Sequence, residues 1–343
     1  FIPQPGLLQK LVQQGGPVAA PQGTVDNVTN LWNSAWKDYG TVDGTFYSAP
    51  LGSNMKSFVW YSPTVFKAKG YTVPTTWDEM MTLSDTMAKD GIKPWCGGIE
   101  SGGATGWPAT DWLEQIVLRQ HGGDVYNQWV SHEVLFDSPQ ITESMDKLAS
   151  WMKNPAYVNA GFGDVKTIAT TSFQDAGKPI LSAKCGMLQQ ASFYAAQWPT
   201  FKKNVKIAED GDVFAFYLPP ISADVPTPIV GGGEFVTAFS DKPEVQAFQT
   251  YLSSGEFATL KVKAGGWVSA NSAVPLDAYT DPISQLSAKY LTDANATFRF
   301  DASDLMPAQV GSGAEWKQMT AWFAPGIPTQ EALANIDAAW PSS

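Results

Sequence analysis

The sequence has little charge, little histidine and little cysteine, and each shortage narrows what the protein can do. Only 16% of its 343 residues are charged, and acids outnumber bases, which gives a formal net charge of −11. No basic patch with interleaved aromatic residues occurs, and an acidic surface repels phosphate backbones and anionic lipid headgroups alike. The composition therefore argues against nucleic acid and anionic membrane surfaces as partners. The apolar fraction of 44% is that of a globular protein, and the length allows two domains.

Motifs for catalysis and for metal binding are also missing. The two histidines, His121 and His132, have no HxxxH or HxxE spacing that would support a metal. No nucleophile elbow or phosphate-binding loop occurs, and the glycines at 231–233 lack the preceding pattern of a nucleotide site. A glycoside hydrolase needs two opposed carboxylates, but 33 acids produce candidate pairs by chance. Those candidates are Glu100, Asp111, Glu114, Glu234, Asp301 and Asp304. We therefore expect no enzyme activity, no metal and no cofactor.

Long apolar runs are absent as well. No uninterrupted apolar stretch approaches the roughly 20 residues that a membrane-spanning helix needs. The opening residues 1–6 have neither a charged segment nor a long apolar one, so no signal peptide is visible. Either a leader has been removed or the sequence begins downstream of the natural start.

The only two cysteines, Cys96 and Cys185, allow two interpretations. Buried thiols are the default for a cytosolic protein. However, each cysteine stands beside a glycine in an apolar, strand-like stretch, so the two could face each other on neighbouring strands. A bond closing so long a loop would stabilise the fold by roughly 4–5 kcal/mol at most. The residues alone leave this choice open.

Tryptophan, in contrast, is abundant, with fourteen residues. We expect most of them to pack in the interior, among them Trp77, Trp112 and Trp340. A flat indole also suits the apolar face of a sugar ring, so many tryptophans with few cations favour a neutral, hydroxyl-rich ligand. Trp107 and Trp267 follow glycines and do not stand in a helical stripe, which favours a place in a cleft over one in the core.

Helical and strand patterns alternate irregularly, which predicts an α/β fold with mixed sheets. Thr76, followed by Asp78 and Glu79, predicts a helix start, because acids in the first turn suit the helix dipole. The pattern predicts strands at 57–61, 95–99, 180–187 and 213–218. It predicts a helix through Trp112 that ends at Gly122, and further helices over about 139–153, 164–176 and 241–262. No internal repeat or low-complexity tract is present.

Short stretches spread in order along the chain resemble one known family. They are residues 1–8 (FIPQPGLL), 44–50 (GTFYSAP), 56–61 (KSFVWY), 74–79 (PTTWDE), 95–102 (WCGGIESG), 106–112 (GWPATDW), 265–271 (GGWVSAN), 301–307 (DASDLMP) and 336–341 (IDAAWP). Together they resemble the family-1 extracellular solute-binding proteins of ABC importers, the relatives of maltose-binding protein. The nearest group is similar to the α-glucoside-binding members.

This resemblance implies a bilobal, type II periplasmic-binding-protein-like fold, with two α/β lobes of mixed sheets joined by a hinge. It places residues 1–53 and 231–292 in lobe 1, and residues 54–230 and 293–343 in lobe 2. Members of the family usually have two further βα units before a segment like 1–8, so we expect the N-terminal part of lobe 1 to be missing from the sequence. The resemblance also favours a disulfide between Cys96 and Cys185.

The positions that match the family's cleft motifs form the expected ligand site. In lobe 1 and at the first crossing these are Gln4, Pro5, Asn54 and Lys56. Elsewhere they are Glu100, Trp107, Asp111, Gln190, Phe193, Gly232, Gly233, Glu234, Trp267, Asp301, Asp304, Met306 and Trp316. Several have plainer alternatives: Glu100 as a cap or surface acid, Lys56 as a solvated lysine, and Asp304 as a turn cap. Glu234 stands where close relatives have aspartate, and Phe193 where maltose-binding protein has a stacking tryptophan.

The function implied is binding of a carbohydrate, an α-glucoside or another oligosaccharide, and its delivery to the permease of an ABC importer by cleft closure. The protein would then act outside the cytoplasm, in the periplasm or at the cell surface as a lipoprotein. Sugar hydroxyls need hydrogen-bond partners and ring faces prefer aromatic surfaces, so polar side chains beside tryptophan suit such a ligand. Two alternatives remain: a secreted glycoside hydrolase, and a binder of the same fold for a non-sugar solute such as a polyamine or a metal complex.

Overall fold

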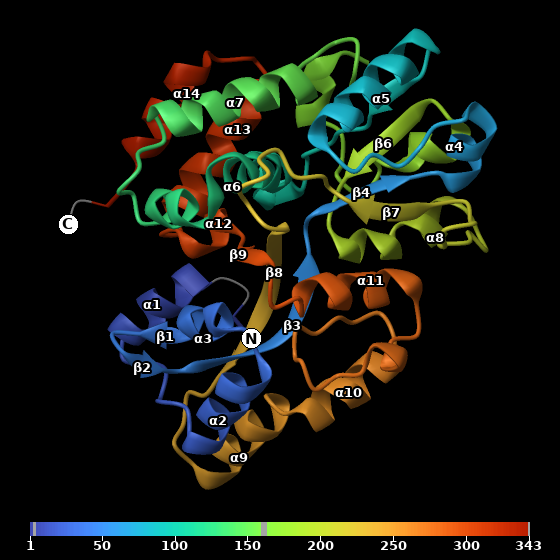
Figure 1. Cartoon of the computed structure of the whole chain (residues 1–343). Helices are drawn as coiled ribbons and strands as arrows, with labels where there is room; N and C mark the ends of the chain where they lie inside the picture. The colour runs from blue at the N-terminus through green and yellow to red at the C-terminus, as the bar shows by residue number, and fades with distance from the viewer. Residues whose placement is uncertain (3–4, 159–162, 342–343) are drawn as a thin grey trace.

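Two separate mixed sheets organise the chain into two α/β lobes joined by crossing segments (Figure 1). The computed structural model describes residues 1–2, 5–158 and 163–341. The arrangement confirms the expected fold class. Within the described residues, none of the helices combines the length and the apolar character needed to cross a membrane.

The sheet of the first lobe has the strand order β3-β8-β9. Strand β3 (Ser48–Met55) is antiparallel to β8 (Pro228–Thr237), and β8 is parallel to β9 (Thr297–Phe300). A small hairpin of β1 (Thr41–Val42) and β2 (Thr45–Phe46) stands apart from it. Helices that lie around this sheet in Figure 1 are α1 (Pro5–Gln13), α2 (Gln22–Leu31), α3 (Ser34–Tyr39), α9 (Pro243–Leu252), α10 (Gly255–Lys263) and α11 (Pro282–Leu291).

The sheet of the second lobe has the order β5-β6-β4-β7. Strand β5 (Lys93–Trp95) is parallel to β6 (Cys185–Gln189), whereas β4 (Phe58–Tyr61) is antiparallel to both β6 and β7 (Phe214–Tyr217). The α-helices of this lobe are α4 (Pro63–Lys69), α5 (Trp77–Lys89), α6 (Trp107–Val130), α7 (Pro139–Met152), α8 (Trp198–Phe201), α12 (Ala302–Leu305), α13 (Trp316–Phe323) and α14 (Thr329–Asp337). Shorter turns of helix in this lobe are η1 (Gly102–Ala104), η2 (Val165–Ala169), η3 (Lys178–Ser182), η4 (Ser192–Ala196) and the π-helix η6 (Val310–Glu315), whereas η5 (Leu276–Ala278) lies between α10 and α11 in the first lobe.

The chain passes between the lobes at three crossings: residues 55–57 after β3, residues 228–231 at the start of β8, and residues 300–302 after β9 (Figure 1). Backbone hydrogen bonds tie them side by side. The Lys56 amide donates to the Val230 carbonyl at 2.9 Å, and the Asp301 amide donates to the Gly231 carbonyl at 2.8 Å. The middle crossing therefore bonds to both of the others, which is a suitable construction for a hinge.

Most of the tryptophans fill the interior, as the sequence predicts. The fully buried ones are Trp36, Trp60, Trp95, Trp112, Trp129, Trp151, Trp198 and Trp322. Trp32 and Trp77 are also buried, and half-buried Trp340 stacks on His132 at 4.1 Å between ring centroids. Half-buried Trp107, Trp267 and Trp316 remain, and all three belong to the predicted cleft set.

Local signals placed some helix ends correctly. Thr76 caps α5 in a capping box, since its hydroxyl accepts from the Glu79 amide at 3.2 Å and the Glu79 carboxylate accepts from the Thr76 amide. This confirms the predicted helix start. The helix end predicted at Gly122 is also confirmed: Gly122 has non-helical backbone angles, with φ of +78°, so the first part of α6 ends there. A second helical segment follows directly and continues to Val130, which the sequence did not predict.

Four other predicted elements need correction. The strand expected over 95–99 is instead β5, which runs from Lys93 to Trp95. The single helix expected over 241–262 is two helices, α9 and α10, because Ser254 caps a new start by accepting from the Phe257 amide at 3.1 Å. The helix expected over 164–176 is only the short η2, followed by turns. The strand expected over 180–187 begins at Cys185, because η3 occupies the residues before it.

Cys96 and Cys185 form a disulfide, with their Cα atoms 5.8 Å apart. Cys185 begins β6 and Cys96 follows β5, and these two strands are neighbours in the sheet. The bond therefore joins adjacent strands of the second lobe, and the pairing that the resemblance favours is confirmed.

Candidate functional site

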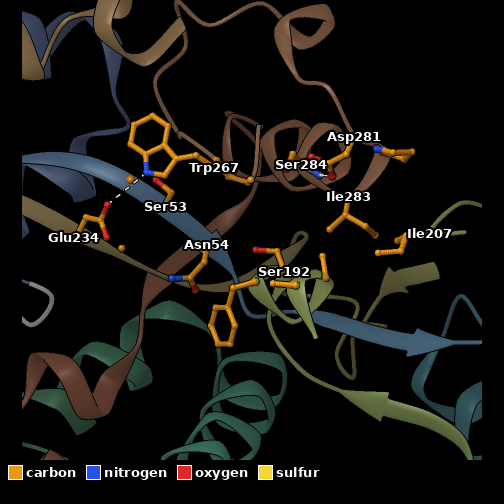
Figure 2. A pocket seen from close by; sticks show the side chains of 17 residues that line it. Ser53, Asn54, Ser192, Ile207, Glu234, Trp267, Asp281, Ile283 and Ser284 are labelled. Atoms are coloured by element: carbon orange, nitrogen blue, oxygen red, sulfur yellow. Dashed lines mark hydrogen bonds between the residues drawn. The ribbon is translucent and has the colours of Figure 1, made fainter. Parts of the chain in front are cut away.

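A cavity of about 430 Å³ opens between the lobes (Figure 2). One wall is made by the end of β3, the middle of β8, the loop through Trp267 and the start of α11. The facing wall comes from η4 and from Ile207 in the second lobe. In Figure 2, Trp267 and Glu234 stand at one end, Ile207 and Ile283 at the other, and Asn54 and Ser192 between them.

The wall of the first lobe depends on how β3 and β8 pair. Asn54 stands opposite Gly232, and Ser53 opposite Gly233, in the antiparallel register. A Cβ on Gly232 would lie 3.1 Å from the side-chain amide of Asn54, so the glycine leaves room for that side chain. Gly52 has the same role beside the cavity, because a Cβ there would lie 2.6 Å from Trp267 Nε1 and 2.7 Å from Glu234 Oε1.

Trp267 and Glu234 form the polar and aromatic end of the cavity. The indole Nε1 of Trp267 donates to Glu234 Oε1 at 3.4 Å, as the dashed line in Figure 2 marks. Phe257 packs edge-on against the indole with ring centroids 6.1 Å apart. A hydrogen bond on one edge and a phenyl ring beside it fix the orientation of the indole, while its half-buried state leaves part of it open.

Asn54 is the cavity residue with an unmet hydrogen-bonding need. Its Oδ1 is buried, and no donor among the described residues reaches it. The hydroxyls on either side have backbone partners: Ser53 Oγ accepts from the Ala270 amide at 3.1 Å, and Ser192 Oγ accepts from the Met55 amide at 3.2 Å. Buried polar atoms normally find partners, so an open acceptor at the rim of a cavity points to a donor supplied from outside the chain.

An aromatic wall continues from the cavity into the second lobe. Phe193 is 41% exposed, and its ring lies 6.0 Å from the ring of Trp107, which in turn meets Phe173 at 5.0 Å. Trp107 is the first residue of α6, and the Lys56 ammonium lies 5.3 Å from the centre of its indole ring. This wall gives the second lobe flat apolar surfaces that face the first lobe across the cleft.

Behind the aromatic wall, Lys56 holds a group of buried carboxylates together. Its Nζ lies 2.8 Å from Asp111 Oδ1 and also contacts Asp301 Oδ2. Burial alone would lower the pKa of Lys56, but Asp111 and Asp301 outweigh it and raise that pKa well above its usual value. Burial would raise the pKa of Asp301, but Lys56 holds it below its usual value. Lys56 and Asp301 therefore form an ion pair between the first crossing and the third.

The same carboxylates come close enough together to hold a metal ion. Oxygens of Asp111, Glu114 and Asp301 lie within 4.8 Å of one another. Lys56 already binds two of the three, and its ammonium supplies the positive charge that the group needs. We therefore assign this group to the lysine rather than to a metal.

The predicted site residues fall into several places. Asn54, Phe193, Gly233, Glu234 and Trp267 line the cavity. Gly232 lies beside it against Asn54, and Lys56, Trp107, Asp111 and Asp301 form the adjoining aromatic and charged group.

The others stand elsewhere. Pro5 lines a separate hollow against α3 and the C-terminal part of α6, and Gln4 lies outside the described residues. Glu100 accepts from the Gly102 amide at 2.7 Å, which is the cap considered for it. The indole of Trp316 donates to Ser303 Oγ at 3.4 Å. Asp304, the next residue of α12 after Ser303, donates its amide to the Asp301 carboxylate. Met306 and Gln190 are buried.

Several cavity residues were not foreseen from the sequence. They are Gly52, Ser53, Ser192, Ala195, Ala196, Ile207, Gly266, Val268, Asp281, Pro282, Ile283 and Ser284. Asp281 could have been found as a helix cap, since Asp-Pro is a helix-start signal and its carboxylate accepts from the Ser284 amide at 2.8 Å. The serines carry no such signal, and only the pairing of distant segments brings them to the cavity.

Two hinged lobes with a polar and aromatic cavity between them define a two-lobed solute-binding protein. A model of the family described as bacterial extracellular solute-binding protein matches residues 1–259. The osmoprotective compounds-binding protein GgtB of Synechocystis is 35% identical over 99% of this chain and 79% of its own length. The α-glucosides-binding periplasmic protein AglE of Rhizobium meliloti is 34% identical over 100% and 75%. The chain therefore belongs to the bacterial extracellular solute-binding protein family, which is not catalytic.

Solved structures support the fold independently. The bacterial solute receptor AcbH, described as having an exclusive preference for β-D-galactopyranose, matches with a TM-score of 0.76 at 21% identity, over 97% of this chain and 80% of that one. Maltose-bound MalE3 of T. maritima matches with a TM-score of 0.64 at 17% identity, over 98% and 81%. These matches confirm the two-lobed fold of periplasmic solute-binding proteins.

Proposed function

We propose that this protein binds an α-glucoside or a related small carbohydrate in the cavity between its lobes and delivers it to the permease of an ABC importer. The observation that carries the proposal is the cavity itself. It combines an indole (Trp267), a carboxylate (Glu234) and an open amide oxygen (Asn54) on the first lobe and the crossing, with Phe193 on the second. Its volume lies within the roughly 300–1,000 Å³ of small-molecule sites.

The chemistry of this set suits a neutral polyol. The carboxylate and the amide can accept and share the hydroxyl protons of a sugar, and the aromatic rings can cover its C–H face. Because the polar groups belong to the first lobe and the crossing while Phe193 belongs to the second lobe, a sugar that contacts both would favour the closed arrangement, and the closed form is what a permease would recognise. The lobes would be divided nearly as the sequence suggests, into residues 1–53 with 231–292 and residues 54–230 with 293–343, except that β9 (Thr297–Phe300), from the second of these parts, pairs with β8 in the sheet of the first lobe. The site of action would be the periplasm or the outer face of the cell membrane.

Relatives support two ligand types. One relative is named for α-glucosides and the other for osmoprotective compounds, and the two are almost equally similar to this chain. The aromatic and hydroxyl-binding groups of the cavity favour a sugar, so we place the α-glucoside first and a small osmoprotective solute second.

A thermal-shift panel tests the proposal. Maltose, trehalose, sucrose, glucose and glycine betaine are each added to the purified protein, with spermidine as the charged, non-sugar competitor. A ligand at 100 times its dissociation constant should add about 2.7 kcal/mol to the free energy of unfolding. We expect one or more disaccharides to raise the melting temperature and spermidine to leave it unchanged. Stabilisation by spermidine or by betaine alone would contradict the α-glucoside proposal.

A further inference from the structure

A second feature of the hinge lies behind the ligand cavity, where β9 runs into α12. Glu114 of α6 is completely buried there. Its Oε1 accepts a hydrogen bond from the Ser303 amide at 3.1 Å, and its Oε2 lies 3.3 Å from the hydroxyl oxygen of Tyr126. The same hydroxyl lies 3.0 Å from the carbonyl oxygen of Phe300, on the third crossing. Glu114 and Tyr126 thus join α6 to both sides of the crossing.

Three contacts meet at this junction, but the Ser303 amide and the Tyr126 hydroxyl supply only one proton each. The third contact needs a proton from the Glu114 carboxyl. A phenol carries a single proton, and a backbone carbonyl can only accept. The nearer contact, to Phe300, therefore takes the proton of Tyr126. The contact between the Tyr126 oxygen and Glu114 Oε2 is then a hydrogen bond only if Glu114 supplies the proton, because two bare oxygens at this distance would repel each other.

We propose that Glu114 is a neutral carboxylic acid in the folded protein and donates its proton to Tyr126, so that α6 is bonded to the third crossing through a proton-dependent contact. Glu114 accepts at one oxygen and donates at the other, which uses both of its oxygens. Tyr126 accepts from Glu114 and donates to Phe300.

The electrostatic surroundings agree with this assignment. Burial, and then the carboxylates of Asp301 and Asp111, raise the pKa of Glu114 well above its usual value, and Lys56 opposes them only in part. Burial and the nearby Glu114 also raise the pKa of Tyr126, so the phenol keeps its proton. The titratable groups that surround the pair are Tyr39 on α3, Lys56 after β3, Asp111 on α6, Asp301 and Asp304 at α12, and Glu315 on η6.

The contact between Glu114 and Tyr126 affects ligand binding through the charged and aromatic residues next to it. This inference about ligand binding rests on the proposed function. Asp301 at the third crossing bonds to Lys56 at the first, and Lys56 lies over the indole of Trp107. A negative charge at Glu114 would attract Lys56 and repel Asp111 and Asp301. Ionisation of Glu114 would thus disturb the hinge and the aromatic wall together.

The test compares the pH dependence of folding in the wild type and in Glu114→Gln. The glutamine can accept from Ser303 and donate to Tyr126 without a titrating proton. If Glu114 takes up a proton on folding, its contribution raises the unfolding equilibrium constant tenfold for each pH unit above the unfolded pKa of about 4.3 and below the raised folded pKa, and Glu114→Gln removes that factor. Urea unfolding at several pH values measures it. Glu331→Gln, at an exposed glutamate on α14, is the matched control and should leave the slope unchanged.

Infrared spectroscopy provides a second readout that does not depend on stability. A protonated carboxyl group gives a C=O band distinct from that of a carboxylate, and we expect Glu114→Gln to remove one such band at neutral pH. Burial also raises the pKa of Asp111 and of Glu315 well above the usual values, so these carboxyls add bands of their own wherever they are protonated, and the band assigned to Glu114 is the one that only Glu114→Gln removes. Glu315→Gln is the comparison, because Glu315 is the other fully buried glutamate, and it should leave the Glu114 band in place. Should Glu114→Gln fail to fold, Tyr126→Phe keeps the carboxyl and removes its acceptor, and it should shift the band.

Either of two results would overturn the proposal. One is an unchanged pH slope in Glu114→Gln; the other is a band that neither Glu114→Gln nor Tyr126→Phe alters. The pH dependence of the unfolding equilibrium constant tests the proton on Glu114 whether or not a sugar binds. Failure of this proposal can therefore be told apart from failure of the proposed function. If a sugar does bind, its dissociation constant should rise more steeply with pH in the wild type than in Glu114→Gln.

Discussion

Trp267 and Glu234 meet at the rim of the interlobe cavity, with the indole Nε1 donating to Oε1 at 3.4 Å. They come from segments more than thirty residues apart, the loop after α10 and the middle of β8. A backbone hydrogen bond joins that loop to β3 as well, since the Ser53 amide donates to the Val268 carbonyl at 2.9 Å. The loop, β3 and β8 therefore act as one frame that presents an aromatic face and an acceptor to the same ligand.

Trp267→Ala should weaken sugar binding about tenfold to a hundredfold, since the indole offers the largest flat surface at the cavity. The melting temperature without ligand should change much less, because the indole is only half-buried. Isothermal titration measures the affinity. Trp340→Ala, at a half-buried tryptophan stacked on His132, is the control and should leave affinity unchanged. Equal losses in both variants would show that Trp267 supports the fold and not the ligand.

Gly52→Ala should also weaken binding, for a different reason. The added methyl would lie 2.6 Å from Trp267 Nε1 and 2.7 Å from Glu234 Oε1, so both side chains must move away from their present places. We expect a loss of affinity of about tenfold, corresponding to about 1.4 kcal/mol. Gly103→Ala is the matched control, because a Cβ there would meet nothing within 4 Å. Unchanged affinity in Gly52→Ala would mean that the Trp267–Glu234 pair does not shape the site.

A cavity residue could be predicted from the sequence only where it stands in a recognisable motif. Trp267 and Glu234 stand beside glycine runs that the family resemblance covers, so they could be named in advance. Ser53 and Ser192 could not, because a serine has no distinguishing pattern and reaches the cavity only through pairing across the chain. The charged group shows the same limit: Lys56 and Asp301 were named individually, but their ion pair depends on the order of three crossings.

The same limit applies to the fold: local and repeated patterns could be predicted, and other features could not. The alternation of helical and strand patterns predicted an α/β fold with mixed sheets, and Thr76 with the acids after it predicted the start of α5; these are repeated or local features. The helical pattern placed the end of the first segment of α6 at Gly122 but missed the second segment that follows directly and continues to Val130. It also missed the break between α9 and α10, because the apolar pattern runs on through Ser253 and Ser254 while the serine cap starts a new helix.

Lys56→Met should destabilise the protein by about 3–5 kcal/mol, because it leaves Asp111 and Asp301 buried without their cation. Urea unfolding at neutral pH measures the loss. The difference from the wild type should shrink as the pH falls, since protonation of the two carboxyls removes the uncompensated charge. Lys202→Met removes a lysine from the exposed pair with Asp212 and should cost less than about 1 kcal/mol. Similar costs for both variants would contradict the buried ion pair.

Asp301 should make the wild type sensitive to acid. Burial alone would raise its pKa, but Lys56 and the hydrogen bonds from Ser303 and Asp304 hold the pKa below its usual value. A carboxyl with a lowered folded pKa contributes stability above its unfolded pKa of about 3.9, and this is lost as the pH falls through the folded value. Asp301→Asn should therefore lose stability at neutral pH and show a flatter acid limb in urea titrations. An acid limb as steep as that of the wild type would locate the sensitivity elsewhere.

The disulfide should contribute strongly to the stability of the second lobe. It closes a loop of 89 residues, for which chain entropy gives about 4–5 kcal/mol as an upper figure. Reduction by dithiothreitol should lower the melting temperature of the wild type. The variant Cys96→Ala/Cys185→Ala should melt at that lower temperature with or without the reductant. A wild-type melting curve that the reductant leaves unchanged would contradict the bond.

The most direct measurement is a crystal structure of the protein with the sugar that stabilises it most. We expect the sugar between the lobes, with a ring against Trp267 or Phe193 and a hydroxyl donating to Asn54 Oδ1. We also expect lobes that lie closer together than in the sugar-free protein. A sugar bound outside this cavity, or bound there without any contact to Trp267, Glu234 or Asn54, would contradict the proposed binding site.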